Sequence, residues 1–494
     1  MITRRKVIES LAAMAAYPVL SSRGLASSGS ALAGAPFPAD SQPQPQGSLT
    51  SASVKVSDTP NGAIGPAFAG LSYEKSEFCH PLFRPSNRNM IALFRLLGPS
   101  LLRIGGDSSD KTVWTPNGRG QKYPQIAPSD VNQVAAFVKA SGWQCLYTVN
   151  LGGSANGNTS PELAADEVAY AAKAFGPSLY GIEIGNEPDS YNKPRRQYDG
   201  QEWSLQKYEA LWNQYRSAIL ARTPNVLITG PAAGHLADWT IPFTKDQGKE
   251  KLGLLTDHYY AGRNHSVSGF TATVLIGPDP ILANNLKMMQ DASRITGIPY
   301  RLGETNSFTG DNHGVSDTYA SSLWVIDFLF DCAQGGAQGV NLHSARDVGY
   351  TPIADDENNV IEVRPEYYGI LFFTMAGMGQ LYQTKVSVGP HDVTAYAAKT
   401  SSGWSIVLVN KDSSQGFRAT LQLPQNVNSA NLISLTQGDG GAPNLSATSG
   451  VTIQGSTVGT DGKFTPAPPY TLDTKGSQVS CYLSPLSAVL IRTT

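Results

Sequence analysis

The sequence predicts an α/β fold, a (β/α)8 TIM barrel followed by a C-terminal β-sandwich domain. Over residues 66–378, strand-like and helix-like segments alternate, which is typical of a (β/α)8 barrel. Over residues 379–494 the pattern changes to short strands with alternating faces and glycine-rich turns, which is typical of a β-sandwich. The strand-like residues 51–65 precede the barrel and are expected to join the β-sandwich. A doubly wound open sheet is the structural alternative for the first of these regions.

Eight apolar segments have the length and composition of buried strands. They are residues 68–73, 101–105, 145–149, 180–184, 226–229, 254–259, 300–303 and 339–343. Helical spacing of apolar residues, capping serines and prolines at first helical positions predict helices between them. The predicted helices are residues 89–97, 131–140, 161–175, 205–221, 279–296 and 316–334. In the β-sandwich we expect strands over residues 394–398, 404–410, 419–423 and 488–491.

The first residues have the character of a targeting segment. Arg4-Arg5-Lys6 precedes a short apolar run, and small residues near position 33 offer a cleavage site. The paired arginines resemble a twin-arginine signal, so residues 1–33 are predicted to direct export of a folded bacterial protein to the periplasm or outside the cell. An uncleaved leader is the alternative. Residues 34–50 are rich in Ser, Ala, Gly and Pro and are expected to form a linker.

Composition excludes several classes of partner. A formal net charge of −2 gives no reason to expect nucleic acid or an acidic membrane surface as a partner. No apolar run is long enough to span a membrane. The 4 cysteines are far apart in the sequence, without metal-ligand spacing, and most are expected to be buried free thiols. We expect no metal or organic cofactor, and a monomer or weak oligomer.

Two glutamates follow predicted buried strands. Glu187 lies in Asn186-Glu187-Pro188 after the fourth strand, and Glu304 ends the seventh. A lone glutamate in such a place is usually an exposed charge beside a loop. In a (β/α)8 barrel, however, both would lie at the C-terminal face, where the active sites of this fold are found. Two facing carboxylates, one protonated and one ionised, are the arrangement needed to cleave a glycosidic bond.

Several motifs together resemble glycoside hydrolase family 79, the β-glucuronidase and heparanase family of clan A. They are Leu102-Arg103-Ile104-Gly105-Gly106, Asn186-Glu187-Pro188, Asp257-His258-Tyr259-Tyr260, Leu302-Gly303-Glu304-Thr305-Asn306-Ser307 and residues 315–320. The resemblance covers residues 68–378 and continues more weakly into the β-domain. It implies retaining hydrolysis through a covalent glycosyl-enzyme, with the two carboxyl groups about 5–5.5 Å apart.

The resemblance also implies roles for single residues. Glu187 would be the acid/base and Glu304 the nucleophile. Asn186 would bind the sugar hydroxyl next to the anomeric carbon, and Tyr259 or Tyr260 would donate a hydrogen bond that keeps Glu304 ionised.

Two acidic residues after the first two predicted strands are further candidates for the sugar hydroxyls. Glu74 resembles the acidic residue that accepts hydrogen bonds from those hydroxyls in the family. Asp107 could do the same, or could cap the chain that follows it.

A site for glucuronic acid must also recognise the sugar's carboxylate. The resemblance assigns this to backbone amides of the stretch Phe308-Thr309-Gly310 and to Tyr350. The side chain of Phe308 cannot donate a hydrogen bond. Three neighbouring residues that could supply positive charge, or lie as solvated loop residues, are His313, His343 and Arg346.

The sequence therefore predicts a retaining exo-β-glucuronidase that releases terminal β-linked glucuronic acid from a small-molecule or oligosaccharide β-glucuronide. The first alternative is a heparanase-like endo-β-glucuronidase, which would need a cleft lined with Lys and Arg. The second is a non-catalytic carbohydrate-binding protein on the same scaffold. We expect the β-domain to support the barrel without a site of its own.

Overall fold

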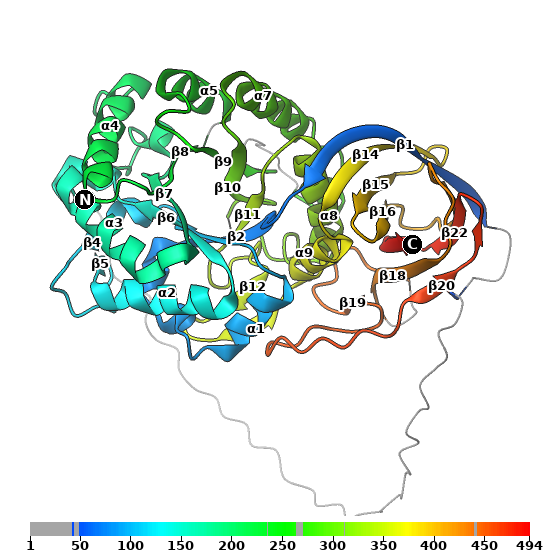
Figure 1. Cartoon of the computed structure of the whole chain (residues 1–494). Coiled ribbons are helices and arrows are strands. Elements are labelled where there is room, and N and C mark those ends of the chain that lie inside the picture. The colour runs from blue at the N-terminus through cyan, green and yellow to red at the C-terminus, as the bar shows by residue number, and fades with distance from the viewer. Residues whose placement is uncertain (1–41, 44–48, 235, 263–269, 311, 439–441) are drawn as a thin grey trace, which may run out of the picture. The chain divides into compact units, whose positions relative to one another are not determined.

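The computed structural model describes residues 42–43, 49–234, 236–262, 270–310, 312–438 and 442–494 (Figure 1). The predicted export signal and most of the predicted linker lie outside the described residues. No helix of the described chain is long and apolar enough to cross a membrane.

Eight parallel strands close into a barrel, in the order β10-β11-β2-β3-β6-β7-β8-β9. Their bounds are β2 Ala69–Glu74, β3 Leu101–Gly105, β6 Gln144–Val149, β7 Leu179–Ile184, β8 Ile228–Ala233, β9 Leu254–Tyr260, β10 Tyr300–Asn306 and β11 Val340–Ser344. The last strand pairs with the first, with Val340 opposite Ala69, so the open-sheet alternative is wrong and the (β/α)8 prediction is confirmed. Strands β9 and β10 also pair along their length, which completes the ring.

Helices connect successive strands of the barrel (Figure 1). Their bounds are α1 Arg88–Leu96, α2 Pro128–Ser141, α3 Pro161–Phe175, α4 Leu205–Arg222, α5 Leu236–Gln247, α6 Ala272–Leu275, α7 Pro280–Thr296, α8 Tyr319–Gln334 and α9 Pro365–Ala376. Three of them, α5, α9 and the one-turn α6, were not predicted. Helix α5 contains Pro242, which ordinarily ends a helix, and α9 is buried nearly all round, so it lacks an amphipathic period.

One predicted barrel strand has different bounds. Residues 226–229 were expected to form the fifth strand, but β8 runs from Ile228 to Ala233. Its middle is Gly230-Pro231, a pair that is typical of a turn in a sequence. Both residues are buried here and the strand continues through them to the mouth of the barrel.

The C-terminal region forms one curled sheet, in the order β19-β18-β23-β16-β15-β14-β1-β17-β22-β21, with β20 paired to β18. Strand β1, Thr50–Ile64, lies between β14 and β17, as expected for the N-terminal strand. The other bounds are β14 Gly379–Ser387, β15 Val393–Thr400, β16 Gly403–Asn410, β17 Phe417–Gln422, β18 Ala430–Gln437, β19 Val451–Ile453, β20 Tyr470–Leu472, β21 Thr474–Lys475, β22 Gln478–Leu483 and β23 Ser487–Thr493. Two small pairs lie in barrel loops, β4 Val113–Trp114 with β5 Gln125–Ile126, and β12 Ile353–Asp355 with β13 Val360–Val363.

Helix α8 packs against the curled sheet through both polar and aromatic contacts. The Tyr319 hydroxyl donates to the Leu486 carbonyl at 2.7 Å, and Lys411 Nζ lies 3.0 Å from Asp327 Oδ2. The rings of Phe330 and Tyr396 stack at 4.4 Å. Helix α8 is the next helix after β10, the strand that carries Glu304, so the β-domain contacts the barrel beside this part of the chain.

All four cysteines are free and buried.

Candidate active site

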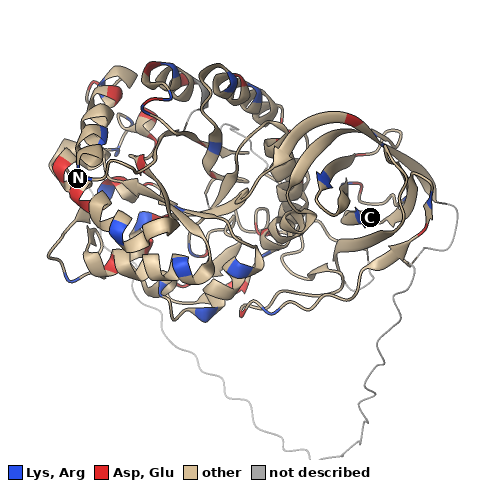
Figure 2. Cartoon of the chain, in the orientation of Figure 1, with Lys and Arg blue, Asp and Glu red and all other residues tan. Residues whose placement is uncertain are grey.

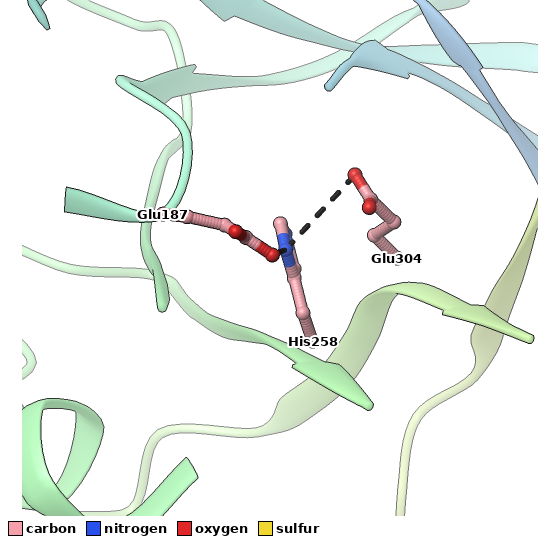
Figure 3. Close-up of side chains that lie close together, drawn as sticks. All are labelled: Glu187, His258 and Glu304. Atoms are coloured by element: carbon pink, nitrogen blue, oxygen red, sulfur yellow. Dashed lines mark hydrogen bonds and ion pairs between the residues drawn. The ribbon is translucent and has the colours of Figure 1, made fainter. Parts of the chain in front are cut away.

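Glu187 and Glu304 face one another at the C-terminal end of the barrel (Figure 3). Glu187 follows β7 and Glu304 lies in β10. His258 of β9 stands between them, with Nδ1 3.2 Å from Glu187 Oε1 and 4.0 Å from Glu304 Oε2. One ligand atom of each of the three residues lies within 4.8 Å of those of the other two. The structure therefore brings the two predicted catalytic residues into one buried cluster.

The backbone turns sharply to present Glu187. Strand β7 ends at Ile184, Gly185 takes a positive φ of 83°, and Glu187 itself has a φ of 47°. A left-handed conformation of a non-glycine residue costs about 1–3 kcal/mol and persists where surrounding contacts hold it. Here the Glu187 N–H donates to the Ala232 carbonyl of β8 at 2.8 Å, and Pro188 begins a short 3₁₀ helix. This turn directs the carboxylate into the mouth of the barrel.

Glu304 is held by two hydrogen-bond donors. Arg103 Nη1 donates to Oε2 at 2.8 Å, and the Tyr260 hydroxyl donates to Oε1 at 2.8 Å. Burial by itself raises the pKa of this carboxyl, but His343, His258, Arg103 and the Tyr260 hydrogen bond together hold the pKa well below its usual range. The Glu304 carboxylate is therefore ionised at neutral pH.

Arg103, on β3, is the fully buried centre of this network. Its Nε lies 2.7 Å from Glu183 Oε2, and its Nη2 donates to Asn186 Oδ1 at 2.8 Å. Burial lowers the pKa of Arg103, but Glu183 and Glu304 raise it beyond the usual arginine value, so the guanidinium stays charged. No role was predicted for Arg103 from the sequence. Its place inside an apolar strand could have indicated one, since a charged residue is rarely buried without a partner.

Gly105 and Gly106 leave room for two charged side chains of the site. A Cβ at Gly105 would lie 2.6 Å from Arg103 Cζ, and a Cβ at Gly106 would lie 2.4 Å from the Glu74 carboxyl carbon. Gly106 also has a φ of 72°, which disfavours any other residue. The Gly-Gly pair after β3 is thus required by close packing against the polar cluster.

Glu74 anchors the loop that follows β3. Its Oε2 accepts from the Ser108 N–H at 2.8 Å and from Ser108 Oγ at 2.5 Å, while its Oε1 accepts from the Asp107 N–H at 3.2 Å. Burial raises the pKa of Glu74. Its Oε1 also lies 3.8 Å from His343 Nε2, and the side chain keeps 24% of its surface exposed, so it remains open to a ligand.

Asp107 joins Asn186 to a residue that sequence reasoning missed. Asn186 Nδ2 donates to Asp107 Oδ1 at 3.4 Å. Arg196 Nη1 lies 2.5 Å from Asp107 Oδ2, and Arg196 Nη2 donates to Glu187 Oε2 at 3.1 Å. Arg196 belongs to a loop of mixed charge, and nothing in the sequence distinguishes it from Arg195.

The two adjacent tyrosines of β9 have different surroundings. Tyr260 contacts Glu304, whereas the Tyr259 hydroxyl donates to Asp279 and its ring stacks on Phe328 of α8 at 6.2 Å. Successive side chains of a strand point to opposite faces, so only one of the pair can face the barrel interior. Of the two tyrosines predicted for this role, Tyr260 is therefore the one that binds Glu304, and a site role for Tyr259 is wrong because it packs on the outside of the barrel.

The residues predicted to bind the sugar's carboxylate differ in their burial and in their contacts. Phe308 is buried and its ring stacks on Phe270 at 4.2 Å. Gly310 is exposed, with a φ of 85°. Tyr350 lies beside Tyr260, with ring centroids 6.1 Å apart, and beside His343 at 6.2 Å. Tyr350 therefore contacts two residues of the site, Tyr260 and His343, whereas the Phe308 side chain packs on another ring.

Of the three residues considered as sources of positive charge, His343 is the one that reaches the site. Its Nδ1 lies 3.9 Å from Glu304 Oε2. Arg346 pairs with Glu357, and His313 Nδ1 lies 2.8 Å from Asp317 Oδ2.

Glu187, His258 and Glu304 have a spacing that could hold a metal ion. The guanidinium of Arg103, at 2.8 Å from Glu304, adds a fixed positive charge beside that position. Coulomb repulsion from the buried Arg103 guanidinium disfavours a metal ion at this position.

The chain is similar to two curated proteins, both named β-glucuronidase. One, from Aspergillus niger, is 26% identical over 347 residues, which make up 62% of this chain and 61% of that protein. The other, from Neurospora crassa, is 23% identical over 378 residues, or 65% of each chain. The chain thus matches less than two thirds of the length of these relatives. No protein-family model matches it.

Solved structures share the fold at low identity. A 4-O-α-L-rhamnosyl-β-D-glucuronidase from Fusarium oxysporum 12S superimposes with a TM-score of 0.71 and 18% identity, covering 89% of this chain and 100% of that one. A family 51 α-L-arabinofuranosidase from Bifidobacterium longum gives a TM-score of 0.65 with 14% identity, covering 90% and 100%. The barrel with its β-domain is therefore a known architecture.

Arg103→Met should lower the free energy of unfolding by about 3–5 kcal/mol, because it leaves the buried Glu183 carboxylate without its cation. Adding Glu183→Gln should restore part of this loss. Urea denaturation of the single and double variants measures the coupling. If the two single losses simply add in the double variant, the buried pair is not coupled as described.

Proposed function

We propose that this protein is a retaining exo-β-glucuronidase of glycoside hydrolase family 79. The observation that carries the proposal is the pair of buried carboxylates, with facing oxygens within 4.8 Å, of which Glu304 is held ionised by Arg103 and Tyr260. The names of the two curated relatives support glucuronides as the substrate class.

Glu304 is the nucleophile in the first step. Its ionised oxygen attacks the anomeric carbon and forms the covalent glycosyl-enzyme, while Glu187 gives its proton to the leaving oxygen. The donors from Arg103 and Tyr260 fix the direction of the attacking carboxylate before substrate arrives. Asn186, oriented by Arg103, presents its amide beside the nucleophile for the neighbouring sugar hydroxyl.

In the second step Glu187 acts as a base. Having lost its proton, it takes one from water, and the hydroxide attacks the anomeric carbon and releases Glu304. Both displacements occur at one carbon, so the configuration is retained. The short separation of the carboxylates supports this, because inverting enzymes need about 6.5–9.5 Å to admit a water molecule.

Groups across the barrel from Glu187 are candidates to bind the sugar. Strand β11 lies four strands from β7 in the closed ring, and Tyr350 follows it, while Glu74 ends the adjacent β2. Glu74 and His343 can bind sugar hydroxyls there, and Tyr350 and the Gly310 amide are neutral donors for the carboxylate. Figure 2 shows Lys and Arg interspersed with Asp and Glu over the outer helices.

A panel of 4-nitrophenyl β-glycosides tests the substrate. We expect the glucuronide to be hydrolysed with a kcat/KM at least about 100-fold above the glucoside, galactoside and xyloside. A site built to bind the sugar's carboxylate discriminates strongly against substrates that lack this group, because its own polar groups are then left unpaired. Nuclear magnetic resonance of the first-formed product should show the β-anomer. An α-anomer as first product, or equal activity on the glucoside, would contradict the proposal.

Removal of each carboxylate should have a distinct result. Glu304→Ala should lower turnover of every substrate by about 10⁴-fold or more, because the nucleophile is lost. Glu187→Ala should lower it by about 10²–10⁴-fold for poor leaving groups but spare the 2,4-dinitrophenyl glycoside. Azide should rescue Glu187→Ala and give the β-glycosyl azide. Formation of the α-azide would reverse the two assignments.

The two tyrosines give a matched pair of variants. Tyr260→Phe removes a hydrogen bond that favours ionised Glu304, so the pKa of Glu304 should rise and the acidic limb of kcat/KM should move about one unit to higher pH. Tyr259→Phe should leave this limb in place, since its hydroxyl binds Asp279. Equal shifts in both variants would argue against the assigned contacts.

A further inference from the structure

The acid/base residue of the proposed reaction shares an arginine with a second carboxylate. Arg196 Nη2 lies 3.1 Å from Glu187 Oε2, and Arg196 Nη1 lies 2.5 Å from Asp107 Oδ2. The Arg196 and Glu187 side chains are 18% and 5% exposed, whereas the Asp107 side chain is 47% exposed. One guanidinium thus joins a buried carboxylate to one that is open to solvent.

The loop that carries Arg196 is well braced. The rings of Tyr198 and Trp203 stack at 4.2 Å, and those of Tyr191 and Tyr198 at 6.0 Å. The Tyr198 N–H donates to the Tyr191 carbonyl at 2.8 Å, and Trp203 Nε1 donates to the Pro188 carbonyl at 2.7 Å. The aromatic cluster therefore connects the loop directly to the turn that holds Glu187, and it positions the backbone of Arg196.

Glu187 must change its charge during the proposed reaction. It holds a proton before the first step and has none before the second, so its neighbours must tolerate both states. The Arg196 guanidinium at 3.1 Å favours the ionised state of Glu187. Asp107 opposes this effect, because it is an anion that pairs with the same guanidinium. Burial lowers the pKa of Arg196, but Asp107 and Glu187 raise it above its usual value, so Arg196 stays charged in either case.

Charged groups of the barrel strands also lie around Glu187. Among the described residues, His258 of β9 lies 3.2 Å away and Glu304 of β10 faces it across the pocket. Arg103 of β3 is committed to Glu304 and Glu183. Arg196 is the residue of this group that comes from a loop outside the barrel strands.

We propose that Arg196 is a positioning residue that sets the ionisation of Glu187, and that Asp107 opposes its effect by pairing with the same guanidinium. When Glu187 is protonated, the guanidinium is held by Asp107; when Glu187 has given its proton to the leaving oxygen, the guanidinium stabilises the carboxylate that acts as the base. This inference rests on the proposed function, because it assigns Glu187 a proton to lose and regain.

Two substitutions should move the pH profile in opposite directions. In Arg196→Gln, Glu187 loses a nearby cation, so the alkaline limb of kcat/KM should move about one unit to higher pH. In Asp107→Asn, a negative charge is removed and Arg196 is left to Glu187 alone, so the same limb should move to lower pH. A merely structural role of either residue would reduce activity without moving the limb in these opposite directions.

The control is Arg195→Gln, which removes the same charge from the adjacent exposed position. We expect its profile to match that of the wild-type protein. The substrate should be phenyl β-glucuronide, whose poor leaving group requires Glu187 as the acid. Each profile should be measured at low and at high salt, because the effect of an exposed charge is screened whereas that of a 3.1 Å pair is retained.

The outcomes separate this inference from the proposed function. If the wild-type protein hydrolyses the glucuronide with a bell-shaped profile and Arg196→Gln leaves the alkaline limb in place, the role of Arg196 is wrong and the function stands. Identical shifts in Arg196→Gln and Arg195→Gln would also overturn it. If the wild-type protein hydrolyses no aryl β-glucuronide, the proposed function itself fails.

Discussion

The buried guanidinium of Arg103 is the interaction on which the candidate site depends. It lies inside the barrel, charged, between the carboxylates of Glu183 and Glu304. A buried ion pair contributes little net stability, because desolvation offsets the attraction. What it contributes here is direction, since a planar guanidinium with several N–H donors holds Glu304 and Asn186 at once in defined orientations.

The two facing carboxylates have surroundings that suit different chemistry. Glu304 lies within a strand and accepts hydrogen bonds from groups on two other barrel strands, β3 and β9. A nucleophile must be ionised and aimed at all times, and fixed donors achieve this. Glu187 lies on a strained turn and contacts a loop arginine that Asp107 also binds. A group that must both release and accept a proton is better served by a cation that a second carboxylate shares.

The β-domain contributes to the site through α8. This helix directly follows the strand of Glu304, and its outer face contacts the curled sheet through Tyr319, Phe330 and Asp327. Tyr259, adjacent to the tyrosine that binds Glu304, stacks on Phe328 of the same helix. The β-domain and β9 thus both contact α8, from outside the barrel.

Local sequence pattern determined the barrel and the positions of its two glutamates. Apolar runs of strand length, ended by glycine or proline, mark β7 and β10, and chain order alone then places Glu187 and Glu304 at one end of a closed parallel sheet. The pattern failed where a residue's local preference opposed its surroundings. Pro242 in α5 and Gly230-Pro231 in β8 indicate breaks, yet the helix and the strand continue through them, and Gly230 and Pro231 are buried.

Tertiary structure alone decided which side chains meet. Arg103 and Glu304 are 201 residues apart, so no local period links them, and both come together only because the ring closes. Tyr259 and Tyr260 are equally apolar and adjacent, so the sequence sets their opposite directions but not which one faces inward. Arg196 and Arg195 are alike in type and differ only in that the aromatic packing of their loop places one of them against Glu187. A side chain's chemistry is written in the sequence, but its partners depend on distances that exist only after folding.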